Sequence, residues 1–99
     1  MTSQFIPLTF IALIAAPVSA AALKGAALMP MAKVSLATAR HTALAARAGT
    51  IKDQELEREK GGSGLRYSFD ILSGGKVYEV GVDAKTGEVL ENGVDAKAD

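Results

Sequence analysis

LRYSFDILSGGKVYEVGVD, residues 65–83, is the stretch of this chain that decides its fold. Apolar and polar side chains alternate on both sides of a Gly74-Gly75 pair, which is the period of a strand with one buried face. A Gly-Gly pair between two such runs is typical of a tight hairpin, because glycine adopts positive φ without strain. The sequence therefore predicts two antiparallel strands. Their buried faces are predicted to carry Tyr67, Phe69, Ile71, Tyr78, Val80 and Val82, with Arg66, Ser68 and Asp70 facing water.

A helix and an edge strand are predicted upstream of this hairpin. Residues 36–48 are rich in Ala and Leu, begin after a capping Ser35 and end at Gly49, for which we expect the left-handed conformation that stops a helix. Residues 51–59 are charged, with Leu56 as the single interior apolar residue, which is typical of a sheet edge that avoids pairing with other chains. The helix face predicted to pack on the sheet consists of Leu36, Ala39, Ala43 and Leu44.

A turn and a short strand are predicted to follow the hairpin. The Asp83 side chain is placed to accept hydrogen bonds from backbone N–H groups two or three residues further on, and Thr86 and Gly87 complete this structural turn. Gly87 is expected at positive φ. Val89 and Leu90 form the last strand. The predicted fold is therefore α+β, with one N-terminal helix packed on a three-stranded antiparallel sheet in the order 1-2-3, and a short fourth strand.

The beginning of the chain carries the pattern of an export signal. Residues 5–18 form an apolar run of signal-peptide length, and the small residues Val18-Ser19-Ala20 suit signal peptidase, so residues 1–20 are predicted to be a signal peptide. The alternative is an uncleaved membrane anchor, because the apolar stretch extended to Leu23 is about long enough to span a bilayer. Cleavage predicts a periplasmic or extracellular protein.

The rest of the chain divides by composition. Residues 21–33 contain Gly and Pro but no sustained period, which predicts a flexible lead-in with order beginning near Val34. The folded domain is predicted at residues 34–91 and a polar tail at 92–99. This tail repeats the GVDAK of residues 81–85, but a repeat architecture needs several longer units, so the repetition is assigned no function.

Composition excludes several classes of function. The eleven Lys and Arg residues balance the eleven Asp and Glu residues, and their interspersion along the chain argues against nucleic-acid and anionic-membrane partners. The chain has no Cys and a single His, which excludes thiol catalysis and any site built on thiolates or on two imidazoles. No cofactor is expected.

Four features resemble functional sites but fit structural roles better. The glycine-rich stretches lack the phosphate-loop pattern and lie between predicted strands. Ser63 lacks the downstream glycine and the strand-to-helix turn of a nucleophile elbow. His41 has no partner at metal-ligand spacing, and the alternating acidic residues of 53–59 share one strand face without wrapping a calcium ion. No catalytic, cofactor-binding or metal-binding residue is therefore predicted.

The order of elements resembles a known family. An Ala-rich helix, a charged strand, a glycine loop and then VYEVGVDAKTGEVL at residues 77–90 are similar to the PepSY domain, found in peptidase propeptides and small exported bacterial proteins. The resemblance covers residues 34–91 and is most specific at 82–89. It departs from the family at Leu36-Ala37-Thr38, where PepSY helices often carry an acidic residue, and in having a single copy of the domain.

The resemblance implies a non-catalytic role as an inhibitor or regulator of peptidases in the cell envelope or outside the cell. No peptidase is attached, so an envelope or secreted peptidase is expected as a partner in trans. The alternative function is an envelope interaction or structural protein with a non-peptidase partner. The oligomeric state is left open, and the membrane is expected to be contacted only through an uncleaved leader.

The surface expected to receive the partner is a sheet edge, where an extended segment can pair with unpaired backbone groups. The first predicted strand is favoured as this partner edge, and its four charged residues are candidates for contact: Glu55, Glu57, Arg58 and Glu59. An ordinary solvated edge is the other interpretation of these residues.

Overall fold

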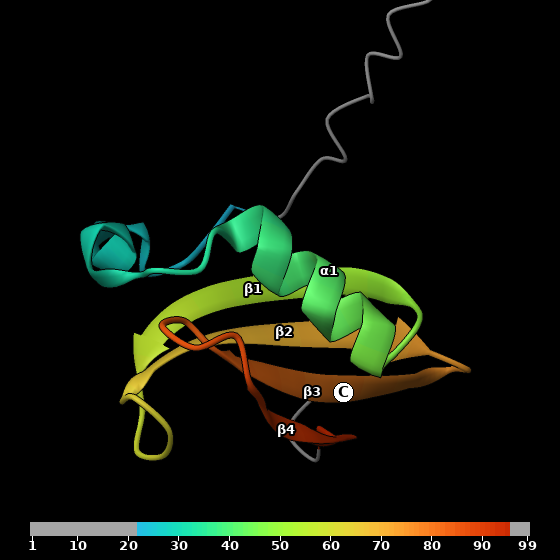
Figure 1. Cartoon of the computed structure of the whole chain (residues 1–99). Helices are drawn as coiled ribbons and strands as arrows, with labels where there is room; N and C mark the ends of the chain where they lie inside the picture. Colours follow the sequence, from blue (N-terminus) through green and yellow to red (C-terminus); the bar gives the residue numbers. More distant parts are fainter. Residues whose placement is uncertain (1–21, 96–99) are drawn as a thin grey trace, which may run out of the picture.

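The computed structural model of this protein describes residues 22–95. Its elements are the 3-10 helix η1 (Ala26–Met31), the helix α1 (Leu36–Ala46) and the strands β1 (Thr50–Arg58), β2 (Leu65–Ser73), β3 (Lys76–Asp83) and β4 (Val89–Val94). The strands form one antiparallel sheet in the order β1-β2-β3-β4, and α1 lies across one face of it (Figure 1). The predicted α+β fold is confirmed, with a fourth strand longer than expected. The predicted signal peptide and residues 96–99 lie outside the described residues.

The core lies between α1 and the sheet. The predicted strand residues Tyr67, Phe69 and Ile71 are fully buried, as are Ala39 and Ala43 of α1. Two alanines at this helix face let the helix backbone approach the sheet closely, while the larger Leu36 and Leu44 are half-buried at the margins. The remaining buried apolar residues are Leu56, Leu65, Val80, Val82 and Ala84. Tyr78 is only half-buried, and the Arg47 guanidinium lies over its ring, 3.8 Å from the ring centroid.

Helix α1 begins as predicted and ends earlier. The Ser35 side chain accepts a hydrogen bond from the Thr38 backbone N–H at 3.1 Å, which caps the first turn. The helix stops at Ala46, and Arg47 is already extended, with φ −145° and ψ 102°. The expected left-handed stop at Gly49 is therefore wrong, since its φ of 159° is nearly extended. A Cβ at Gly49 would instead collide with the Leu72 carbonyl, so close packing on β2 explains this glycine.

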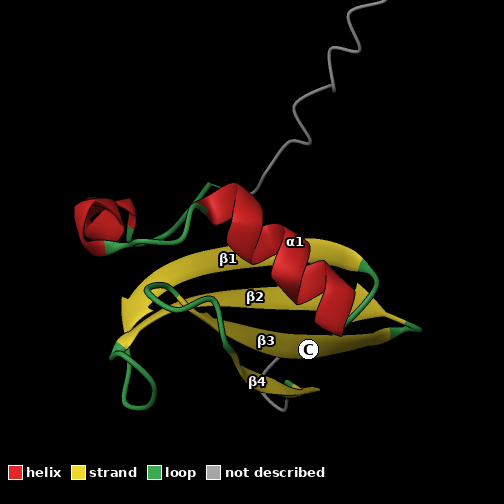
Figure 2. Cartoon of the chain, viewed as in Figure 1, coloured by secondary structure: helices red, strands yellow, loops and turns green. Residues whose placement is uncertain are grey.

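Order begins before Val34, the position at which the sequence predicts it. The Lys24 N–H donates to the Gln54 carbonyl at 3.1 Å, and the Leu56 N–H donates to the Lys24 carbonyl at 2.8 Å. These bonds form a short parallel bridge on the outer edge of β1. The following η1, drawn as the short helix beside the sheet in Figure 2, contacts β1. Its half-buried residues Leu28 and Met29 pack on the core, and two adjacent apolar residues give no 3.6-residue period by which the sequence could predict a helix.

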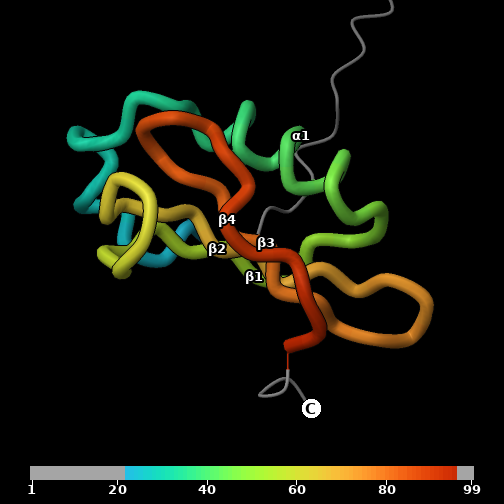
Figure 3. The backbone as a smooth tube through the Cα atoms, turned by 60° about the horizontal axis from the view of Figure 1, so that its bottom comes forward, coloured from blue at the N-terminus to red at the C-terminus, as the bar shows by residue number. Residues whose placement is uncertain are grey.

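The loop between β3 and β4 is tied to the segment before α1. Figure 3 shows this loop folded back beside the start of α1. The Ala84 carbonyl accepts hydrogen bonds from the N–H groups of Lys33 and Val34, both at 2.9 Å. The Tyr67 hydroxyl donates to the Val34 carbonyl at 2.7 Å, which satisfies the polar end of a buried ring. The N-terminal segment is thus joined to the sheet at β1, at β2 and at the turn.

Candidate functional site

The sheet has a second face, on the side away from α1 (Figure 1). Successive side chains of a strand point to opposite faces, so the residues that lie between the buried ones point to this second face. A hollow of about 550 Å³ on this face is lined by residues of β1, β3 and β4, and a smaller one beside it shares Glu79 and Asp95. We call this surface the open face and define it by Glu55, Glu57, Glu59, Arg66, Ser68, Asp70, Glu79, Glu91 and Asp95.

The open face is acidic, which corrects the expectation that charges are interspersed. All eleven Asp and Glu residues lie in residues 53–99, whereas the first 52 residues contain five Lys and Arg and no acid. Alternation along the strands then gathers carboxylates from β1, β2, β3 and β4 on one side of the sheet. The balanced net charge of the whole chain conceals this separation. A face of this sign repels phosphate groups.

Arg66 is the central cation of the open face and is buried, although the sequence predicts it in water. Its Nη1 lies 3.4 Å from a carboxylate oxygen of Glu59 and 3.5 Å from one of Glu91, and its Nη2 donates to the Lys60 carbonyl at 3.1 Å. Its stem passes so close to Gly81 that a Cβ there would lie 2.8 Å from Arg66 Cδ. The glycine thus leaves room for the arginine, whose Nε has no partner within residues 22–95.

Crowding of carboxylates changes the proton affinity of the open face. Burial, followed by the nearby charges of Glu91 and Asp95, raises the pKa of Glu79 to about 7. A hydrogen bond with Glu57, together with burial, raises the pKa of Glu59, and burial and the neighbouring Asp95 raise that of Asp70. Glu79 therefore takes up a proton near neutral pH, where isolated carboxyl groups are fully ionised.

We expect Glu79→Gln to stabilise the domain above pH 7 and to have little effect at pH 5. The pKa of Glu79 rises from an ordinary 4.5 to about 7 on folding. The contribution of its protonated carboxyl to stability is therefore complete below about pH 4.5 and is lost as the pH rises through about 7. The full shift corresponds to about 3 kcal/mol. Solvent screens a half-buried carboxyl, so the expected gain is about 1 kcal/mol. Urea unfolding at several pH values measures it, and equal midpoints for the two proteins at high pH would contradict the prediction.

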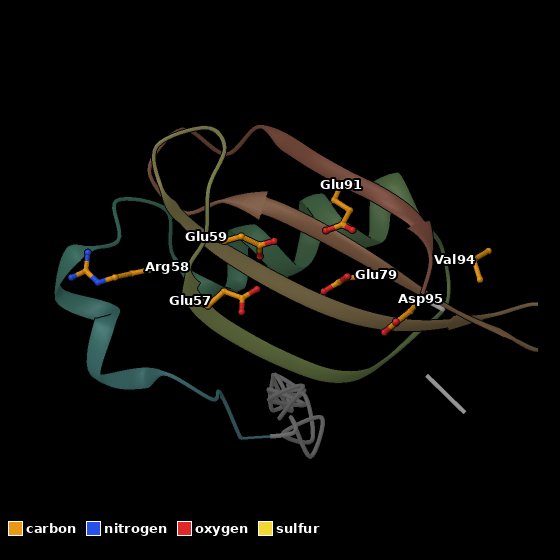
Figure 4. Close-up of a pocket in the computed structure, with 7 residues that line it drawn as sticks. All are labelled: Glu57, Arg58, Glu59, Glu79, Glu91, Val94 and Asp95. Carbon is orange, nitrogen blue, oxygen red and sulfur yellow. The ribbon is translucent and has the colours of Figure 1, made fainter. Parts of the chain in front are cut away.

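The predicted partner edge is only partly free. Lys24 pairs with the outer edge of β1 at Gln54 and Leu56, so no partner strand can pair there without displacing it. The side chains of Glu57 and Glu59 point into the hollow, whereas Arg58 points away from it (Figure 4). Arg58 Nη2 instead lies 3.0 Å from the Met31 sulfur. Of the four residues predicted together, the three glutamates thus share the open face and the arginine does not.

The predicted turn at Asp83 is tied to the β1–β2 loop. Asp83 is fully buried and accepts hydrogen bonds from the N–H groups of Lys85 at 2.8 Å and Thr86 at 3.1 Å, and Gly87 has φ 79°. Ser63 adds its N–H at 2.6 Å and its hydroxyl at 2.7 Å. Burial alone would raise the pKa of Asp83, but the bonds from Ser63, Lys85 and Thr86 outweigh it and hold this pKa below its usual range.

The sequence contains a weak signal for this long-range contact. Gly62 has φ 55°, and a Cβ there would collide with the Asp83 carboxylate. The glycines around Ser63 therefore allow the loop to approach a buried carboxylate, in addition to making it long enough to turn. Ser63 donates its hydroxyl proton to Asp83, and His41 is exposed on α1, in a separate part of the fold.

A family match covers most of the folded part of the chain. Residues 33–92, more than half of the sequence, match the family model described as "Peptidase propeptide and YPEB domain", PepSY. The chain belongs to the PepSY family. No curated protein and no solved structure gives a significant match. The matched PepSY region contains α1, the strands β1 to β3, the first four residues of β4, the open face up to Glu91 and the Asp83 turn.

The described part of this PepSY chain has neither a cluster of metal ligands nor a membrane-spanning helix. Within residues 22–95, no three His, Cys, Asp or Glu side chains are close enough to hold a metal ion. The carboxylates of the open face are therefore spread across it and not gathered at one point. None of the helices in the same residues is long and apolar enough to cross a membrane.

Proposed function

We propose that this PepSY protein is exported and acts as a non-catalytic module that regulates a peptidase by binding it in trans. The family match over residues 33–92 carries the proposal, because the family is described by its occurrence in peptidase propeptides. The predicted signal peptide at residues 1–20 supports the location, since it delivers the domain to the compartment of envelope and secreted peptidases.

The chemistry of the described side chains supports binding over catalysis. The hydroxyl–carboxylate pair of Ser63 and Asp83 serves the fold, because it holds the β1–β2 loop against the β3–β4 turn. A serine nucleophile needs a base to take its proton, and Asp83 is a poor base because its pKa is lowered. His41, exposed on α1, is in a separate part of the fold.

Two surfaces that suit a partner are the open face and the outer edge of β4. β4 pairs with β3 on one side only, and Val94 at its end is 61% exposed. The β1 edge is less accessible because Lys24 already pairs there. An envelope interaction protein with a non-peptidase partner would use the same surfaces, so the identity of the partner separates the two functions.

Capture of the natural partner tests this function. The protein, purified from cells that express the full chain, is immobilised and exposed to envelope and secreted fractions of the organism that makes it. We expect it to retain a peptidase, and we expect Glu55→Lys with Glu57→Lys to weaken the capture. Glu88→Lys, in the turn outside the hollow, is the matched control and should retain it. Reproducible capture of non-peptidase partners alone would replace this function by the interaction-protein alternative.

A further inference from the structure

We propose that the open face is a docking surface for a cationic polypeptide segment of the partner, whose Lys or Arg side chains pair with its carboxylates. This inference rests on the proposed binding function and adds the surface and the chemistry of the partner. It differs from pairing at a sheet edge, because side chains on the face, and not the backbone of an edge strand, make the contact.

The charge balance of the face is the first argument. Seven carboxylates lie on it, and Arg66 is its one cation among the described residues that define it. Lys24 adds a pair to Asp53 at 2.8 Å, at the β1 margin. The like charges repel one another, and this repulsion is relieved when cations from another molecule approach.

The spacing of the carboxylates indicates a polypeptide and not a single metal ion. They come from all four strands and line two adjoining hollows, and no three of them within residues 22–95 are close enough to share an ion. A chain with cationic side chains can reach several such points at once. Contacts of this kind are individually weak at a surface, so several are needed to give useful affinity.

Arg66 supplies a second, independent observation. Its side chain is 9% exposed, and its Nε is a buried donor without a partner in the described residues. Such a donor is costly to leave unpaired. The Arg66 guanidinium thus lacks one acceptor beside the two carboxylates that its Nη1 contacts, and a backbone carbonyl of a docked chain would supply one. A polypeptide offers both the cations and the carbonyl groups, whereas a polyamine offers cations alone.

Peptide binding to the purified protein tests this surface without the peptidase. The probe is a fluorescent peptide of about ten residues that alternates Lys and Ala, and the competitors are spermine and the matching Glu-Ala peptide. We expect the Lys-Ala peptide to bind at pH 8, and spermine to compete at least about tenfold more weakly than unlabelled Lys-Ala peptide, because it lacks carbonyl groups. We expect no competition from the Glu-Ala peptide.

Variants locate the binding on the open face. Glu57→Gln with Glu79→Gln removes two negative charges. In the wild type the Ser68 hydroxyl donates to Glu57 at 2.7 Å, and the amide oxygen introduced by Glu57→Gln can still accept this hydrogen bond. We expect this double variant to weaken binding about tenfold, and Glu88→Gln to change it less than about twofold. Raising the salt from about 20 to about 300 mM should weaken binding by the wild-type protein, which tests the electrostatic argument without any variant.

Several results would overturn the proposed surface. They are equal binding by the double variant and the wild type, binding that salt does not weaken, and equal competition by spermine. Self-association through the open face, detected as a concentration-dependent mass that the double variant abolishes, would also overturn it. If the peptide binds as expected but no peptidase is captured, the proposed function fails and the proposed surface stands. If a peptidase is captured but the peptide does not bind, the proposed surface alone is rejected.

Discussion

Asp83→Ala is expected to unfold the domain or to bring it close to unfolding. The variant leaves the N–H groups of Ser63, Lys85 and Thr86 without the acceptor that now receives them. A hydrogen bond to a charged acceptor contributes about 1.5–3 kcal/mol. Because Ser63, Lys85 and Thr86 are exposed and water can replace part of what their N–H groups lose, the expected loss from the three bonds is about 3–5 kcal/mol. A core of this size supplies only about 3–5 kcal/mol of net stability. Circular dichroism during urea unfolding measures the loss.

The pH dependence of Asp83 provides an independent check. Its folded pKa lies below the ordinary value of 3.8, so its contribution to stability is complete above that value and is lost as the pH falls through the folded pKa. The wild type should therefore lose stability on acidification below about pH 4. Glu88→Ala removes a carboxylate from the same turn and is the control. A variant at Asp83 that is as stable as this control would contradict the account of the turn.

Phe69→Ala is expected to have an effect of similar size through the core. Phe69 is fully buried and stacks on Tyr67 with ring centroids 6.2 Å apart. Truncation of a buried phenylalanine typically costs about 3–5 kcal/mol, which is close to the whole stability expected here. Thermal melts measure the change. Leu72→Ala, on the same strand and 39% exposed, is the matched control, and equal melting temperatures would mean that the buried face is misassigned.

The regular elements could be predicted from the sequence because their periods are short and clear. Alternation in residues 65–83 predicts β2 and β3, and the face that it assigns to Phe69 is the buried one. Ser35 identifies the start of α1. The end of α1 could not be predicted in this way, because a glycine after a helix has two explanations. Gly49 is required by close packing on the Leu72 carbonyl and not by a left-handed turn.

The N-terminal segment could not be predicted from periodicity. Its link to β1 consists of backbone hydrogen bonds of Lys24, which any residue with an N–H could make. Its other link is the Tyr67 hydroxyl on the Val34 carbonyl. A buried tyrosine needs an acceptor, so the sequence indicates that such a contact exists, but it does not indicate which carbonyl is used.

The acidic open face could have been predicted, although the balanced net charge of the chain conceals it. Glu55, Glu57 and Glu59 alternate with Leu56 on one strand, and Glu79 alternates with the buried Val80 on another. Two strands whose buried faces coincide must also share their opposite face. Alternation could not predict the burial of Arg66. This side chain contacts Glu91 of β4, and the sequence predicts that this strand ends at Leu90.

The central claim is that this PepSY protein changes the activity of a peptidase that it binds. The most direct measurement is the initial rate of the captured peptidase as the purified protein is added in increasing amounts. The account predicts a rate that changes and reaches a plateau near one molecule of this protein per peptidase, with Glu57→Gln and Glu79→Gln together shifting the plateau to higher concentration. A rate that stays constant while binding saturates would contradict it.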